Sequence, residues 1–156
     1  MEEEAQKTSP SHGHVAEPLR TIGLVGLVWL PFGIYLAGYF PGVMTFDSVD
    51  QWRQVVDGRW VDNQPVLHTA IVWVGVQAGG PGLVALFQSV FLAAGLVRLA
   101  RSLVEFGADP RAVAVAVAAC VLNPAVGLFS VCLWKDVPFT AAVRFMTAAV
   151  VRCAAA

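Results

Sequence analysis

Residues 21–40 read TIGLVGLVWLPFGIYLAGYF and contain no charged side chain. This charge-free stretch continues to residue 46, and two more follow over residues 63–97 and 112–134. A helix that crosses the hydrocarbon core of a bilayer needs about 20 apolar residues, and each of the three stretches is long enough. Together they predict an all-α protein, a polytopic transmembrane helical bundle, and they exclude a soluble domain.

The composition supports this prediction and narrows the partners. Hydrophobic residues make up 57% of the 156 residues and charged residues 13%, against about 25% charged residues in soluble domains. The formal net charge of −1 provides no basic surface for nucleic acid. Cys120, Cys132 and Cys153 lie in apolar runs without a CxxC motif, so neither a zinc site nor a disulfide framework is predicted. The expected partner is the lipid bilayer.

The first part of the chain divides into a tail and a span. Residues 1–19 are acidic and polar, unlike a signal peptide, and are predicted to be a disordered cytoplasmic tail. The membrane domain then covers residues 20–156, and its first span covers about residues 20–39. Pro31 and Gly33 are expected to interrupt this span. The backbone groups that lose their hydrogen bonds there must be satisfied by neighbouring helices.

The stretch from residue 63 to 97 is too long for one helix and is broken by Gly-Gly-Pro-Gly at 79–82. The half before the break, residues 66–78, would be about 20 Å long at 1.5 Å per residue. Because that is short for a crossing, it is predicted to be a helix on the membrane surface. The half after the break, residues 83–99, is the predicted second span.

The third predicted span is residues 112–134, with a kink at Pro124, which cannot donate a backbone hydrogen bond. A fourth helix is expected to start at residues 137–156, although Arg144 and Arg152 make it a poor isolated span. The sequence ends without a polar tail, so it is interpreted as a fragment of a larger bundle.

Charge sets the predicted orientation. An arginine cluster separates the second and third spans, and two more basic residues precede the first span; these are Arg98, Arg101, Arg111, Lys7 and Arg20. The positive-inside rule places both groups in the cytoplasm. The prediction is therefore a multi-pass protein of the cell membrane with a cytoplasmic N-terminus. An outer loop with surface helices, residues 41–81, shares the outer face with Lys135 and Asp136.

The outer loop contains most of the candidate site. Ser48 followed by Gln51 is a capping-box pattern that predicts a short helix, with Asp47 just before its start and Asp50 in its first turn. The side chains expected to rest on the membrane are Val49, Trp52 and Val56. Acidic residues at a helix start are also favoured by the helix dipole alone. The alternative to a functional role is therefore that Asp47 and Asp50 are simple helix caps.

The predicted topology brings Asp47, Asp50, His68, Lys135 and Asp136 to one membrane face. Carboxylates in partly desolvated sites can act as bases or metal ligands, and a lysine beside them suits an anionic phosphate. A lipid phosphate arriving from the bilayer would meet such a site directly. Taken singly, Asp136 also opens a helix well, and His68 in an apolar context is more often a packed histidine.

Three motifs in order carry a resemblance to a known family. They are TFDSVDQW (45–52), NQPVLHT (63–69) and NPAVGLFSVCLWKDVPF (123–139). Their order and intervals resemble the GT-C superfamily of membrane glycosyltransferases, the group of protein O-mannosyltransferases and aminoarabinose transferases, over about residues 20–145. The sequence departs from the family's pattern at Ser48, where many members have a second acid, and at Gln64, where a histidine often precedes the proline.

The resemblance implies transfer of a sugar from a polyprenyl-phosphate-linked donor to an acceptor on the outer face. Asp47 would be the catalytic base that deprotonates the acceptor hydroxyl. Asp136, with Lys135, would orient the donor phosphate directly or through a divalent cation, for which Asp47 and Asp136 are the candidate ligands. The other expected substrate-binding residues are Asp50, Gln64 and His68.

Two other classes of function remain open at this point. A transporter or lipid-handling protein is the first, because broken helices such as those at Pro31 and Pro124 are common around substrate sites in transporters. It predicts functional polar residues near the bilayer midplane, where Asn123 is the candidate. The second is a non-catalytic membrane subunit, which the short length favours.

Overall fold

The computed structural model describes residues 13–61 and 65–155 of the chain. These residues form seven α-helices and no strand beyond a single isolated bridge, so the predicted all-α class is confirmed. In chain order the helices are α1 (Gly13–Gly38), α2 (Phe46–Val56), α3 (Val66–Ala78), α4 (Pro81–Glu105), α5 (Pro110–Val121), α6 (Pro124–Val131) and α7 (Asp136–Ala155).

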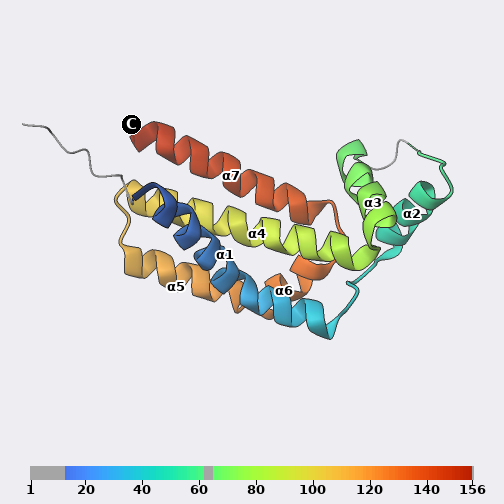
Figure 1. Ribbon diagram of the computed structural model, residues 1–156, viewed down its shortest axis with the longest axis horizontal. Helices are drawn as coiled ribbons and strands as arrows, with labels where there is room; N and C mark the ends of the chain where they lie inside the picture. Colours follow the sequence, from blue (N-terminus) through green and yellow to red (C-terminus); the bar gives the residue numbers. More distant parts are fainter. Residues whose placement is uncertain (1–12, 62–64, 156) are drawn as a thin grey trace, which may run out of the picture.

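The helices form an elongated bundle around α4 (Figure 1). Helix α7 lies along one side of α4, and α1 and α5 lie along the other. Helices α2 and α3 sit together at the end where α1 finishes and α4 and α7 begin, and α3 is steeply inclined to α4. We call this the loop end. The opposite end, where α1 and α5 begin and α4 and α7 finish, is called the arginine end.

Three of the helices are long and apolar enough to cross a membrane. These segments are Glu17–Gly38 in α1, Pro81–Glu105 in α4 and Asp136–Ala154 in α7. At 1.5 Å per residue, the 25 residues of α4 extend for about 37 Å, more than the roughly 30 Å of bilayer hydrocarbon. Helices α5 and α6 reach the same length and composition only as a pair, bent by 63°.

Small and polar residues bring the long helices together around α4. A Cβ added to Gly95 of α4 would lie 3.0 Å from the backbone oxygen of Ala141 in α7, so the missing side chain allows the two helices to approach closely. On the other side of α4, Trp29 Nε1 donates to Ser89 Oγ at 3.1 Å and ties α1 to α4. Next to this contact, Phe32 is fully buried in the main hydrophobic cluster.

The two arginines of α7 both have partners within the bundle. Arg144 Nη1 donates to the backbone oxygen of Leu92 in α4 at 3.4 Å. Arg152 Nε forms an ion pair with Glu105 Oε2 at 3.3 Å. Charged side chains are tolerated in apolar helices when they face the bundle and pair there. A helix that reads as a poor isolated span therefore becomes acceptable once it packs against α4.

Helix α1 differs from the expectation at its start and at its centre. It begins at Gly13, so the end of the predicted tail, residues 13–19, is helical; residues 1–12 lie outside the described part of the chain. It also continues through Pro31 without a break. A proline removes one backbone hydrogen bond, and the adjacent Phe32 is fully buried in the bundle.

The expected kink in residues 112–134 is a complete break between two helices. Asn123 Oδ1 accepts a hydrogen bond from the backbone N–H of Ala125 at 2.9 Å, which caps a new helix that starts at Pro124. Beyond Val131 the chain is extended and runs beside residue 43: Val43 N–H donates to the oxygen of Val131 at 3.0 Å. The helical part of the predicted third span therefore ends before Trp134.

Helix α2 is set differently from its prediction. Thr45 is its N-cap, without a side-chain capping bond, so the capping box predicted from Ser48 is wrong and Asp47 lies in the first turn. Its buried face is largely polar, comprising Ser48, Gln51, Gln54 and Val55. Val56, one of the side chains expected to rest on the membrane, is exposed. Hydrogen-bonding groups on the neighbouring segments, described next, orient this helix.

Candidate functional site

Two segments far apart in the sequence meet at the loop end, residues 45–48 and residues 133–136. Ser48 Oγ donates to the backbone oxygen of Leu133 at 2.7 Å, and both side chains are buried. Trp134 Nε1 donates to Thr45 Oγ1 at 2.6 Å. A buried hydrogen bond left without its partner costs about 1–3 kcal/mol, so these contacts fix the start of α2 against the start of α7.

The two segments enclose an open pocket of about 350 Å³. Its lining includes Asp47 from the first turn of α2, and Lys135 and Asp136 at the start of α7. All three side chains are solvent-exposed. Two helix N-termini therefore face one pocket, and helix N-termini favour anionic groups. The pocket combines two carboxylates, one ammonium group and two positive helix ends.

The structure separates Asp50 from this group. Asp50 does not line the pocket; its Oδ2 accepts a hydrogen bond from Gln54 Nε2 one turn later, at 2.8 Å. The two carboxylates therefore have different surroundings, because Asp47 lines the pocket and Asp50 is bonded to Gln54. Gln64, the other expected substrate-binding residue of this loop, lies outside the described residues.

His68 is held by a chain of hydrogen bonds that determines where its proton lies. Thr69 Oγ1 donates to the backbone oxygen of Pro65 at 3.3 Å, so it accepts the hydrogen bond from Gln51 Nε2 at 2.7 Å. The amide oxygen of Gln51 then faces His68 Nδ1 at 2.6 Å. An amide oxygen can only accept, which assigns the proton to Nδ1 and leaves Nε2 of the neutral ring with a free lone pair.

The surroundings of His68 keep it neutral. Burial, and to a smaller extent the positive charge of Lys135, lower the pKa of His68 from 6.5 to about 4, against the opposing effect of Asp136. The side chain is only 3% exposed, and Nε2 has no hydrogen-bond partner among the described residues. His68 is therefore a neutral, Nδ1-protonated imidazole whose neighbour Gln51 lines the pocket.

The donor set for a cation is small. Asp47 and Asp136 line the same pocket, and no group of three or more His, Cys, Asp or Glu side chains that could hold a metal ion occurs in residues 13–61 and 65–155. Magnesium is commonly bound through one or two carboxylates and the phosphates of a substrate. The two carboxylates fit that mode and do not form a metal site by themselves.

Sequence reasoning anticipated the charged residues but missed the polar ones between them. Ser48, Gln51 and Gln54 repeat at intervals of three along α2 and form its buried face. A polar stripe on a short helix is ordinarily solvated, so the sequence offered no signal that these side chains are buried and need hydrogen-bonding partners.

Comparisons with protein-family models, curated proteins and solved structures find no match to this chain.

Proposed function

We propose that this chain is the part of a membrane glycosyltransferase that binds a polyprenyl-phosphate-linked sugar in the pocket between α2 and α7. The observation that carries the proposal is the convergence of Asp47, Lys135 and Asp136 in one open pocket at the loop end. Large apolar side chains are exposed in the segment that contributes to this pocket and just after it, including Phe46 (88%) and Trp60 (51%). Such side chains are typical of a membrane–water interface, from which a lipid-linked donor would arrive.

The distribution of basic residues supports an outer location for this pocket. Five arginines lie at or next to the arginine end, namely Arg20, Arg98, Arg101, Arg111 and Arg152, whereas the described basic residues of the loop end are Arg53, Arg59 and Lys135. The positive-inside rule then assigns the arginine end to the cytoplasm. In this orientation the N-terminus is cytoplasmic and the protein lies in the cell membrane.

The proposed reaction gives a role to each charged group of the pocket. Asp47 accepts the proton of the acceptor hydroxyl, and the acceptor oxygen forms a bond to the anomeric carbon of the sugar. The bond between that carbon and the phosphate oxygen breaks, and the electron pair leaves with the polyprenyl phosphate. Lys135 offsets the charge of the leaving phosphate. A divalent cation, if the reaction uses one, would be held by Asp136 and Asp47 and would neutralise phosphate charge.

The substitution Asp47→Asn tests the chemistry. It removes the basic oxygen but keeps the shape. Because Asp47 lies in the first turn of α2, losing its charge should cost the helix only about 0.3–1 kcal/mol. Loss of a general base costs about 10²–10⁴-fold in rate. Transfer would be measured in membranes containing the full-length gene product, a polyprenyl-phosphate sugar and the acceptor. Asp50→Asn is the matched control, because Asp50 lies outside the pocket; a near-normal rate for Asp47→Asn would refute the assignment.

The orientation has its own test. Single cysteines at Asp57 and Phe106, both exposed, report the loop end and the arginine end in a cysteine-free background. An impermeant thiol reagent applied to intact cells should label position 57 and spare position 106. Labelling of position 106 alone would invert the topology and remove the pocket from the outer face.

A transporter or lipid-handling protein is the second candidate, favoured by the 63° break between α5 and α6. The side chain at that break, Asn123, caps α6 through Ala125, which gives it a structural role. Transport would be distinguished from transfer by uptake into vesicles without any new glycosidic product. A non-catalytic subunit would show neither activity nor any effect of Asp47→Asn.

A further inference from the structure

At the arginine end, we infer that a groove between α1, α4 and α5 binds one acyl chain of an anionic phospholipid, whose phosphate lies against Arg20. The groove has a volume of about 740 Å³ and is lined by side chains of all three helices. It lies at the other end of the bundle from the pocket of the proposed sugar transfer.

The groove is polar at one end and apolar along the rest of its length. Arg20, Arg101 and Glu105 line its mouth, and the walls beyond them are apolar, including Leu24, Leu27, Val97, Val113, Val117 and Val121. Along α5 it runs from Pro110 to Val121, about 16 Å at 1.5 Å per residue. This is close to half of the roughly 30 Å of bilayer hydrocarbon, so the groove matches the depth of one leaflet.

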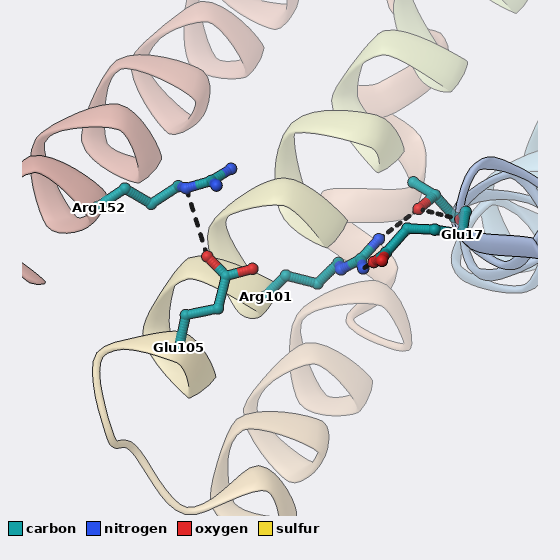
Figure 2. A network of polar contacts seen from close by, with 5 residues as sticks. Glu17, Arg101, Glu105 and Arg152 are labelled. Carbon is teal, nitrogen blue, oxygen red and sulfur yellow. Dashed lines mark hydrogen bonds and ion pairs between the residues drawn. The ribbon is translucent and has the colours of Figure 1, made fainter. Parts of the chain in front are cut away.

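The charges at the mouth leave a basic group available. Arg101 pairs with Glu17 and donates to Thr21, and Arg152 pairs with Glu105 (Figure 2). Both glutamates are thus engaged in ion pairs. Arg20 is exposed and makes no side-chain hydrogen bond or ion pair with any described residue. Basic pockets between transmembrane helices on the cytoplasmic side suit phospholipid head groups.

The distribution of charge along the groove favours a lipid. One exposed arginine, Arg20, lies at the mouth, and apolar walls continue from it for about 16 Å along α5. This arrangement matches one anionic headgroup with one acyl chain below it. The inference rests on the membrane placement in the proposed function and not on its chemistry, so either can fail alone.

Lipid binding to the purified, delipidated full chain tests the inference directly. The protein would be titrated with phosphatidylglycerol and with phosphatidylcholine of the same chain length, and bound lipid counted by native mass spectrometry. Phosphatidylglycerol should bind more tightly. Arg20→Gln should weaken its binding about fivefold, the effect of one basic residue near an anionic headgroup, and leave phosphatidylcholine unchanged. Arg59→Gln, at the loop end, is the matched control and should change neither affinity.

Filling the groove provides the second arm. Ala114→Trp places a large side chain in the groove and should abolish retention of the bound phosphatidylglycerol, whereas Met146→Trp, on an exposed part of α7, should not. Equal affinity for the two lipids would overturn the inference, as would equal effects of Ala114→Trp and Met146→Trp. A dimer mass that replaces the lipid adduct would assign the groove to a second copy and overturn it as well.

Discussion

His68 should remain neutral in the folded protein down to about pH 4, with its proton on Nδ1. The pKa falls from 6.5 to about 4. Each pKa unit is worth about 1.4 kcal/mol, so protonating the ring in the folded protein costs about 3 kcal/mol more than protonating it in the unfolded chain. The cause is burial first, then the charge of Lys135, with Asp136 opposing. The hydrogen bond from Nδ1 to Gln51 at 2.6 Å selects the tautomer.

The consequence for stability has a definite sign. The folded pKa lies below the unfolded one, so between pH 6.5 and about 4 the unfolded chain binds the proton that the folded protein refuses. Stability from this group is fully present above pH 6.5 and is lost as the pH falls toward 4. The free energy of unfolding should therefore fall by up to about 3 kcal/mol between pH 6.5 and about 4 because of His68. Replacing His68 with Gln should remove this part of the pH dependence.

Nitrogen-15 chemical shifts of the imidazole measure both claims. The variant with His12→Gln and His14→Gln leaves His68 as the sole histidine, so its two ring nitrogens can be followed without overlap. The expected spectrum from pH 5 to 8 shows a protonated Nδ1 and an unprotonated Nε2. Gln51→Leu removes the acceptor and should redistribute the tautomers. Titration near pH 6.5, or a proton on Nε2 in the unmodified site, would refute the reasoning.

Two further predictions concern packing. Ser48→Ala removes the donor to the buried oxygen of Leu133 and should lower the free energy of unfolding by about 1–3 kcal/mol; an unchanged denaturation midpoint would show that water replaces the hydroxyl. Gly127→Ala places a Cβ 2.3 Å from the ring of Tyr35 and should destabilise by about 1–3 kcal/mol. Gly26→Ala, with nothing within 4 Å, is its control and should be neutral or stabilising in the same assay.

Much of the helical organisation could be predicted because it follows from local pattern. Charge-free runs longer than 20 residues and the Gly-Gly-Pro-Gly break fix where helices can exist, and the predicted bounds of α3, Val66–Ala78, are those observed. The start of α2 was misplaced, since Ser48 fits a capping box locally and its hydroxyl instead donates to Leu133, 85 residues away. Local spacing carries no information about such a partner.

The same limit applies to the site. Asp47, Lys135 and Asp136 could be grouped from topology alone, because charged residues in an apolar chain must gather at membrane faces. The role of Gln51 could not be predicted, since its amide acts between Thr69 and His68 and neither is its neighbour on the helix. A polar residue on a short helix is ordinarily solvated, and only the packing of α3 against α2 reveals that this one is buried.

The break at Asn123 bears on which function the architecture serves. If α5 continued as a straight helix through residue 134, no extended segment would be available beside residue 43. Because α5 ends just before Asn123 and α6 ends at Val131, the chain is extended at Leu133. Leu133 N–H can therefore donate to the oxygen of Val43 at 2.9 Å, and the backbone oxygen of Leu133 can accept from Ser48. These two bonds position the residues that follow, at the start of α7, against α2. The broken helix thus builds the polar pocket at the end of the bundle, which is the pocket that the proposed transfer uses.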